Sequence, residues 1–207
     1  MKTTLSICMA CITGLIALST IFTDLAGSTA WAARNGTSSV TTALSADEAE
    51  MLTFMREEEK LARDVYIAMY QKWGAVTFSN ISKSEQNHMD TLKKKLDKYH
   101  LPDPAQPALG VFTNADLQGK YDQLLAAGSQ SLIDGLYVGA TIEEIDMVDI
   151  QHAINVTTHL DVINAYQNLL EGSKNHLRAY VKALAAQGIT YAPQFISQEF
   201  YNAIIGL

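Results

Sequence analysis

Apolar side chains recur at helical spacing along four long segments of the chain, with polar side chains between them. Proline and glycine stay out of most of these segments, and no alternating apolar and polar run of strand length occurs. The pattern therefore predicts an all-α domain. Its long helices are expected over residues 45–73, 79–99, 131–154 and 158–187.

The ends and connections of these segments predict how the helices are arranged. Ser45 and Glu48 form a capping box at the first helix, and Gly74 ends that helix. Three of the four prolines follow the second helix, in a long connection that carries a shorter predicted helix over 113–127. Two helical hairpins joined by one long crossover give a four-helix bundle of the ferritin-like layout. The aromatic tail from residue 188 is expected to pack against it.

The first helix contains three consecutive glutamates, and the helical period separates them. At about 100° per residue, Glu58 falls within the apolar stripe of this helix. Glu57 projects to the polar side and is expected in solvent. Glu59 lies at the margin, where Lys60, Arg63 or a neighbouring helix is its expected partner. Glu58 is therefore the glutamate predicted to enter the bundle.

The other long helices also carry ionisable side chains at inward positions. On the second helix, Glu85 lies in the middle of the apolar stripe and His88 on its edge. On the third helix, Glu143 lies in the stripe and Asp146 follows one turn later, while the fourth helix contributes His176. The complete inward set is Glu58, Glu85, His88, Glu143, Asp146 and His176.

These inward residues predict a metal site. An isolated ionised carboxylate is costly in an apolar core, so it must be protonated, paired or bound to a metal. Because three helices each place a glutamate in the stripe, Glu58 is expected within reach of Glu85 and His88. Carboxylate oxygens combined with imidazole suit iron or manganese, and two helix-borne clusters indicate a dinuclear site.

Four motifs carry a resemblance to a known family: MREEEKLARDVY, SEQNHM, TIEEIDMVDI and GSKNHLRAY. The chain from about residue 46 to 187 is similar to the ferritin-like superfamily of di-iron and di-manganese carboxylate proteins, and within it resembles the uncharacterised family DUF2202. The superfamily pattern implies a glutamate on the first and third helices and Glu-x-x-His on the second and fourth. Ser173 stands where the last glutamate is expected, and Asp146 is the hypothesised source of the missing oxygen.

Several polar residues have a second interpretation. Asp146 is either a ligand or an acceptor that orients a histidine. Glu144, like Glu59, is expected to pair with a basic residue or a neighbouring helix. An error of one position in the first helix would make Glu59 a ligand instead, and the same error in the third helix would make Glu144 one. The histidines expected outside the site are His100, His152 and His159, and the tyrosines expected in the core are Tyr66, Tyr166 and Tyr180.

The N-terminal segment has the pattern of an export signal. A positive start, a long apolar run and an A-x-A ending at Ala32 predict that residues 1–32 are a signal peptide. Residues 33–44 are expected to be a flexible leader and 45–207 the bundle domain. The alternative is a membrane anchor, since about eighteen apolar residues just span a bilayer. Cleavage would place the domain in the periplasm or outside the cell, without stable membrane insertion.

Composition narrows the chemistry further. Both cysteines, Cys8 and Cys11, lie in the predicted signal peptide, so carboxylate and imidazole would be the metal ligands of the mature chain. The net charge of −7 argues against nucleic acid as a partner. We therefore expect an exported metal-binding oxidoreductase, with a pair of iron or manganese ions, that acts on Fe(II), dioxygen or peroxide. The alternatives are a non-catalytic metal-binding or structural bundle of the cell envelope and a metal-free interaction domain.

Overall fold

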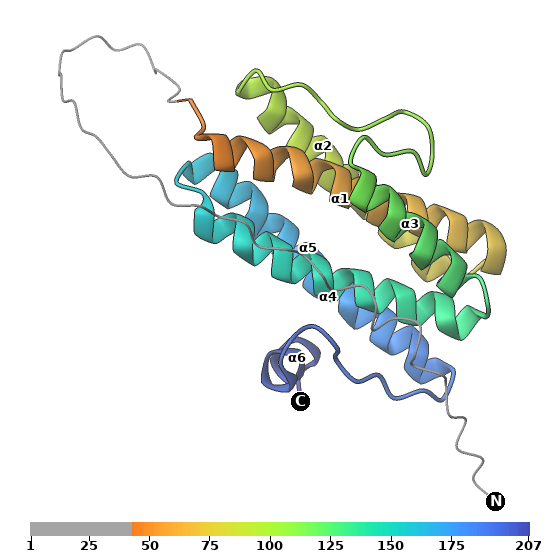
Figure 1. The fold of residues 1–207 in the computed structure, drawn as a ribbon. Helices are drawn as coiled ribbons and strands as arrows, with labels where there is room; N and C mark the ends of the chain where they lie inside the picture. The colour runs from red at the N-terminus through yellow and green to blue at the C-terminus, as the bar shows by residue number, and fades with distance from the viewer. Residues whose placement is uncertain (1–42) are drawn as a thin grey trace, which may run out of the picture. The chain divides into compact units, whose positions relative to one another are not determined.

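Six helices and no strand make up residues 43–207, the part of the chain that the computed structural model describes (Figure 1). The predicted signal peptide and most of the predicted leader fall outside this part. The all-α fold is confirmed, and so is the bundle with a helix in its crossover. No helix among the described residues is both long and apolar enough to span a membrane. The helices are α1 (Ala46–Trp73), α2 (Val76–Lys98), α3 (Ala115–Gly128), α4 (Leu132–Val156), α5 (Leu160–Ala186) and α6 (Gln198–Ile205).

The four long helices form two hairpins that pack on each other. α1 pairs with α2 and α4 with α5, while α1 also packs on α4 and α2 on α5. Figure 1 shows that the crossover returns along the bundle, so that α4 runs in the same direction as α2. α3, inside this crossover, packs on α1 and α4, and the tail helix α6 contacts α5.

Local sequence signals set most helix ends. The Ser45 hydroxyl accepts from the Glu48 N–H at 3.2 Å, and the Glu48 carboxylate accepts from the Ser45 N–H at 2.8 Å, as the capping box predicts. Gly74 ends α1 in the left-handed conformation with φ of 67°, and α2 begins directly after this reversal, three residues before the predicted start at residue 79. Helix α6 was not predicted, although Ser197 caps it by accepting from the Phe200 N–H.

Two apolar clusters leave a polar layer between them along the bundle. One contains Tyr66, Phe78 and Leu136, and the other contains Leu52, Leu92, Ile150 and Tyr166. On α1, α2 and α5, the inward-facing ionisable residues lie between the positions that belong to the two clusters. On α4, Glu143 lies within the positions of the first cluster, close to where the second cluster begins at Ile150. Apolar clusters therefore lie on both sides of these inward-facing ionisable residues along the bundle.

Candidate metal centre

Glu59 is the glutamate of α1 that contacts the ionisable residues of α2. Its Oε2 lies 3.2 Å from the Nδ1 of His88. Its position continues a row of buried residues at alternating spacings of three and four, namely Leu52, Met55, Glu59, Ala62, Tyr66 and Met69. The expectation that Glu58 would meet Glu85 and His88 is therefore wrong by one position. The alternating spacing around Glu59 was the signal in the sequence that could have found it.

The prediction failed because α1 has no solvated side at this level. Glu57, Glu58 and Glu59 are all buried, with exposed fractions of 3%, 5% and 1%. The Glu57 carboxylate accepts from the backbone N–H groups of Thr113 and Asn114, at 2.6 and 2.9 Å, where the crossover enters α3. The expectation that Glu57 lies in solvent is also wrong. The angular position of a residue relative to a solvent-exposed face therefore could not tell which of the three glutamates points to the bundle interior.

Lys60 and Asp64 complete this outer contact of α1 with the crossover. Both side chains are fully buried and form an ion pair. The Lys60 ammonium also donates to the carbonyl of Ala108 at 2.9 Å, and Asp64 accepts from the N–H of Gly110 at 2.8 Å. We call Glu57, Lys60 and Asp64 the crossover clasp, because together they bind the crossover through its backbone.

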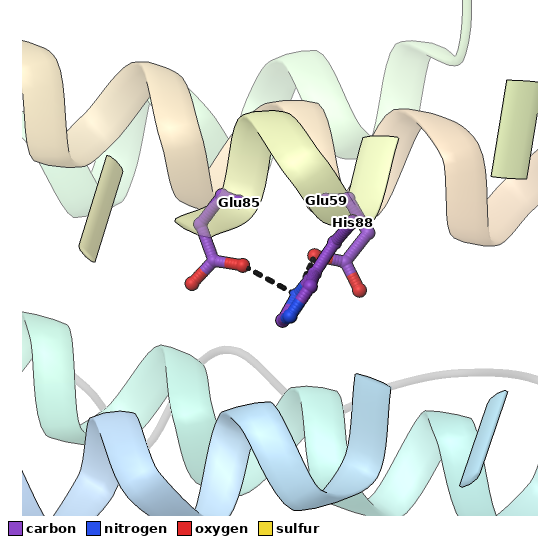
Figure 2. Close-up of side chains that lie close together, drawn as sticks. All are labelled: Glu59, Glu85 and His88. Carbon is purple, nitrogen blue, oxygen red and sulfur yellow. Dashed lines mark hydrogen bonds and ion pairs between the residues drawn. The ribbon is translucent and has the colours of Figure 1, made fainter. Parts of the chain in front are cut away.

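Glu85 of α2 lies between two histidines and joins two groups of potential ligands. Its Oε2 is 2.8 Å from the Nδ1 of His88, and its Oε1 is 2.8 Å from the Nδ1 of His176 on α5. Oε2 of Glu143 on α4 lies 3.3 Å from the same Nδ1 of His176. Figure 2 shows Glu59, Glu85 and His88 converging.

These contacts define two triads, Glu59–Glu85–His88 and Glu85–Glu143–His176. In each triad, the three potential ligand atoms lie within 4.8 Å of one another. Every long helix contributes, and Glu85 belongs to both triads. Four of the predicted ligands, Glu85, His88, Glu143 and His176, are thus brought together by the fold.

Several atoms of the triads have no hydrogen-bond partner although they are buried. They are Glu59 Oε1, Glu85 Oε1 and His176 Nδ1. The last two are only 2.8 Å apart, yet the contact lacks hydrogen-bond geometry. An unsatisfied buried polar atom costs about 1–3 kcal/mol, and a cation bound by each triad would give these atoms a partner and reduce that cost. The residues present therefore fit a metal ion.

The two imidazoles are held with Nδ1 directed at the carboxylates. Ser84 Oγ lies 2.9 Å from the Nε2 of His176, so the ring is fixed by its other nitrogen, as is usual for a metal-binding histidine. His88 packs against Gly172 of α5, where an added Cβ would lie 2.5 Å from the His88 Nε2. The His88 and His176 rings stack with their centroids 5.4 Å apart.

Burial and the charges of neighbouring side chains shift the pKa values of the triad residues. Burial raises the pKa of Glu59 to about 7, although His88 opposes the shift. Burial would also raise the pKa of Glu85, but the adjacent imidazoles of His176 and His88 favour its charged form and lower the pKa to about 2. The carboxylates outweigh burial at both histidines and raise the pKa of His88 to about 12 and that of His176 to about 10. Without a metal, the imidazoles hold protons at the positions where a divalent cation would replace them.

Asp146 lies beside the triads but does not belong to either. One of its carboxylate oxygens accepts from the hydroxyl of Ser173, which also donates to the carbonyl of Leu169 at 3.0 Å. Burial, followed by the charges of Glu59 and Glu143, raises the pKa of Asp146. Ser173 is fully buried in the position where a glutamate was expected. The serine and the aspartate thus fill this part of the layer together.

Two neighbours of the triads had other expected environments. Glu144 is fully buried and accepts from the Tyr191 hydroxyl at 2.8 Å and from the N–H groups of Gln194, Phe195 and Ile196. It binds the tail, so the expectation of a basic partner is wrong. Tyr66 is in the core as expected, and its hydroxyl also donates to Oε1 of Glu143 at 2.5 Å, which the sequence did not indicate.

The remaining histidines lie outside both triads, as expected. His100 and His152 are exposed. The Nδ1 of His159 lies 2.9 Å from Oε1 of Glu48, at the N-terminal end of α5. Candidate chemistry in the described part of the chain is therefore concentrated in the layer around Glu85.

Comparison with known proteins identifies relatives of this chain. The chain is 48% identical over 163 residues to "Uncharacterized protein MJ0754" of Methanocaldococcus jannaschii, which covers 78% of this chain and 88% of that protein. The fold is similar to the crystal structure of hypothetical protein MJ0754 from Methanococcus jannaschii, with a TM-score of 0.79 and 46% identity over 83% of this chain and 98% of the other. The profile of the family described as "Uncharacterized protein domain (DUF2202)" matches residues 48–206, and the chain belongs to this family.

Proposed function

We propose that the protein is a metal-binding member of the ferritin-like superfamily that holds a pair of iron or manganese ions and acts as an oxidoreductase on Fe(II), dioxygen or peroxide. Glu59 and His88 would hold one ion, and Glu143 and His176 the other, with Glu85 giving an oxygen to each. The observation that carries this proposal is the contact of the two Glu85 oxygens with two histidine Nδ1 atoms, each at 2.8 Å.

The chemistry of the donor set supports iron or manganese. Four carboxylates, those of Glu59, Glu85, Glu143 and the adjacent Asp146, lie in one buried layer with two imidazoles. Carboxylate oxygens with imidazole nitrogens suit these metals, and bound iron or manganese would supply one-electron redox changes. The apolar clusters on both sides of the layer would limit the access of water.

The chain's own groups would position ligands and hold protons. The Tyr66 hydroxyl fixes Glu143 by donating to its Oε1, which leaves Oε2 directed at His176. The Ser173 hydroxyl fixes one oxygen of Asp146, while Oδ1 of Asp146 is free to hold a proton beside the triads. The raised pKa of Asp146 fits this role.

Export is part of the proposal and is supported by the N-terminal pattern of an apolar run followed by an A-x-A ending. In the periplasm or outside the cell, the triads would meet metal ions and small oxidants directly. Such a protein would require an electron donor from outside the chain if it reduced peroxide repeatedly.

Metal content and Fe(II) oxidation test this proposal. The purified protein is expected to hold about two iron or manganese ions per chain, as the two triads imply. Glu85→Ala should lose both ions, while His88→Ala and His176→Ala should each lose one. His152→Ala, at an exposed histidine, is the matched control and should retain both. Addition of Fe(II) in air should give a rise in near-ultraviolet absorbance in the wild type, which Glu85→Ala abolishes. Wild-type protein without bound metal after reconstitution would refute the proposal.

A non-catalytic metal-binding or structural bundle is the second candidate, because Ser173 occupies the position of the sixth ligand. A single bound ion per chain, together with no oxidation of added Fe(II), would favour this function over the first.

A further inference from the structure

The C-terminal tail, residues 188–207, contacts both α4 and α5. After α5 the chain reverses and runs back along the bundle to α6 (Figure 1). On α4, the Glu144 carboxylate is fully buried. Its Oε1 accepts from the Tyr191 hydroxyl at 2.8 Å, and its Oε2 accepts from the backbone N–H groups of residues 194–196 at 2.8, 2.6 and 3.2 Å. All four of these hydrogen bonds come from the tail.

The tail is also anchored on α5. The Nε of Arg178 donates to the carbonyl of Ile204, near the end of α6, at 2.6 Å. The Lys174 ammonium lies 5.6 Å from the centroid of the Phe200 ring. Tyr201 and Ile204 are buried in the apolar cluster that also contains residues of α4 and α5. The tail therefore joins α4 to α5.

These anchors lie next to ligands of the second triad in the sequence. Glu144 follows Glu143 directly, and Arg178 comes two residues after His176. Oε2 of Glu143 and Nδ1 of His176 are 3.3 Å apart, so a change in the rotation or spacing of α4 and α5 would alter this contact. Successive helical residues project about 100° apart, so only one of the two adjacent glutamates can face His176.

We infer that the tail positions the second triad: by binding Glu144, it fixes α4 so that Glu143 and not Glu144 faces His176. The N–H groups and the hydroxyl that hold Glu144 form charge-assisted hydrogen bonds, which are stronger than those between neutral groups. Without the tail, the Glu144 carboxylate would lose all four of these donors, and it would turn toward solvent or toward a bound cation. Either rotation would carry Glu143 away from His176. Glu144 is thus a positioning residue of the second triad.

The crossover clasp differs from the tail in this respect. The bonds of Glu57, Lys60 and Asp64 to other segments run from α1 to the crossover. The tail instead bridges α4 and α5, which carry two of the three residues of the second triad. The role of these residues as metal ligands rests on the proposed function, while the contacts of the tail do not depend on it.

Mn²⁺ binding by full-length variants tests this inference, with electron paramagnetic resonance of free Mn²⁺ as the measurement. His88→Ala leaves the second triad intact, and His176→Ala leaves the ligands of the first triad, so each background reports on one site. Glu144→Leu removes the acceptor of all four hydrogen bonds from the tail. In the His88→Ala background it should weaken Mn²⁺ binding about tenfold, the lower end for loss of a group that orients metal ligands. In the His176→Ala background it should leave binding unchanged.

Two further substitutions serve as controls. Glu144→Gln keeps an oxygen for the three N–H groups, and its amide can donate to the Tyr191 oxygen, so most of the binding should return. Glu199→Leu makes the same change as Glu144→Leu at an exposed carboxylate of α6 and should bind like its parent. Unchanged binding in Glu144→Leu, or equal weakening in both backgrounds, would overturn the inference. If Glu144→Leu does not fold, Tyr191→Phe carries the test, because it removes only one of the four hydrogen bonds.

A second measurement separates this inference from failure of the proposed function. Nuclear magnetic resonance of the metal-free full chain resolves the imidazole rings of its histidines. In Glu144→Leu the ring signals of His176 should shift, while those of His159, at the N-terminal end of α5, should not. A shift confined to His176 would support the role of the tail even if the wild type binds no metal. Unchanged His176 signals would count against it, whatever the metal content.

Discussion

Helix α1 carries two buried groups of charged side chains on adjacent positions, and they differ in how their charges are satisfied. In the crossover clasp, Glu57 accepts two backbone N–H groups, and the Lys60 ammonium meets both Asp64 and a carbonyl oxygen. In the triads, carboxylates outnumber imidazoles, and Glu59 and Glu85 each keep an oxygen without a hydrogen-bond partner. The two groups are therefore buried to a similar extent, but the charges of the clasp are paired while several atoms of the triads have no hydrogen-bond partner.

This difference distinguishes a structural charge cluster from a candidate site. A buried ion pair with all its hydrogen bonds in place is complete as it stands, and removal of one partner leaves the other unpaired. A cluster with excess negative charge and converging unpartnered atoms is completed only by a proton or a cation. The clasp should therefore respond to substitution through stability, and the triads through metal binding and pH.

The largest expected effect breaks the clasp. Lys60→Met leaves Asp64 buried without its ammonium partner, and should lower the free energy of unfolding by about 3 kcal/mol, near the lower end for a broken buried pair. The expected loss of stability is near the lower end of this range because Arg63 still donates to Asp64 at 2.6 and 2.8 Å. Urea denaturation measures the change. The double variant Lys60→Met/Asp64→Asn should lose less than the sum of the single losses. Metal content per folded chain should not change, and a loss of metal would show that clasp and triads are not independent.

The next effect is the pH dependence of the metal-free protein. The pKa of Glu59 is raised from 4.5 to about 7, so its contribution to stability is present below pH 4.5 and lost as the pH rises through 7. The pKa values of His88 and His176 are raised from 6.5 to about 12 and about 10, so their contributions are present below pH 6.5 and lost as the pH rises toward those values. The pKa of Glu85 is lowered from 4.5 to about 2, so its contribution is lost as the pH falls through 2.

Together these shifts predict that the metal-free protein is most stable near pH 5 and loses stability toward pH 9. The maximum lies there because the contribution of Glu85 is complete above pH 4.5, while that of Glu59 is lost as the pH rises to about 7. Chelator-treated protein, melted at a series of pH values, gives the measurement. Metal-loaded protein should lose less over the same range, because the cation replaces the protons and binds more tightly as the pH rises. Equal pH profiles with and without metal would contradict this account.

The smallest expected effect on stability comes from Gly172→Ala. The new Cβ would meet the His88 ring at 2.5 Å, so the ring must move, while alanine favours the helix by up to about 1 kcal/mol. The free energy of unfolding should change by less than about 1 kcal/mol, while metal binding at the first triad weakens. Gly119→Ala in α3 is the matched control, because nothing lies within 4 Å of its added Cβ, and it should keep full metal binding. Intact metal content in Gly172→Ala would show that His88 does not need its present position.

Most of the fold followed from patterns close together in the sequence. Helical spacing of apolar residues, the Ser45–Glu48 capping box and Gly74 placed the helices to within a few residues. The same spacing identified Glu85, His88, Glu143 and His176 as inward-facing, because each lies on a helix with a distinct apolar stripe. These residues meet in the folded chain.

The errors fall where a segment distant in sequence covers a helix. Glu57 faces the crossover, and Glu144 faces the tail, about 50 residues away in each case. A helix covered on both sides has no solvated face, so the position of an apolar stripe does not tell which acidic residue points to the bundle interior. This is why the sequence pattern pointed to Glu58, although Glu59 is the glutamate that belongs to the first triad.

The sequence by itself determined that this chain forms an all-α bundle with ionisable residues at one level of its long helices. It determined this because helical periodicity and caps act over a few residues. Only the tertiary structure decided that Glu85 is shared by two histidines and that Glu59 completes the first triad. It also decided that Ser173 pairs with Asp146. Those outcomes depend on the packing of four helices and two covering segments, whose contacts join residues far apart in the chain.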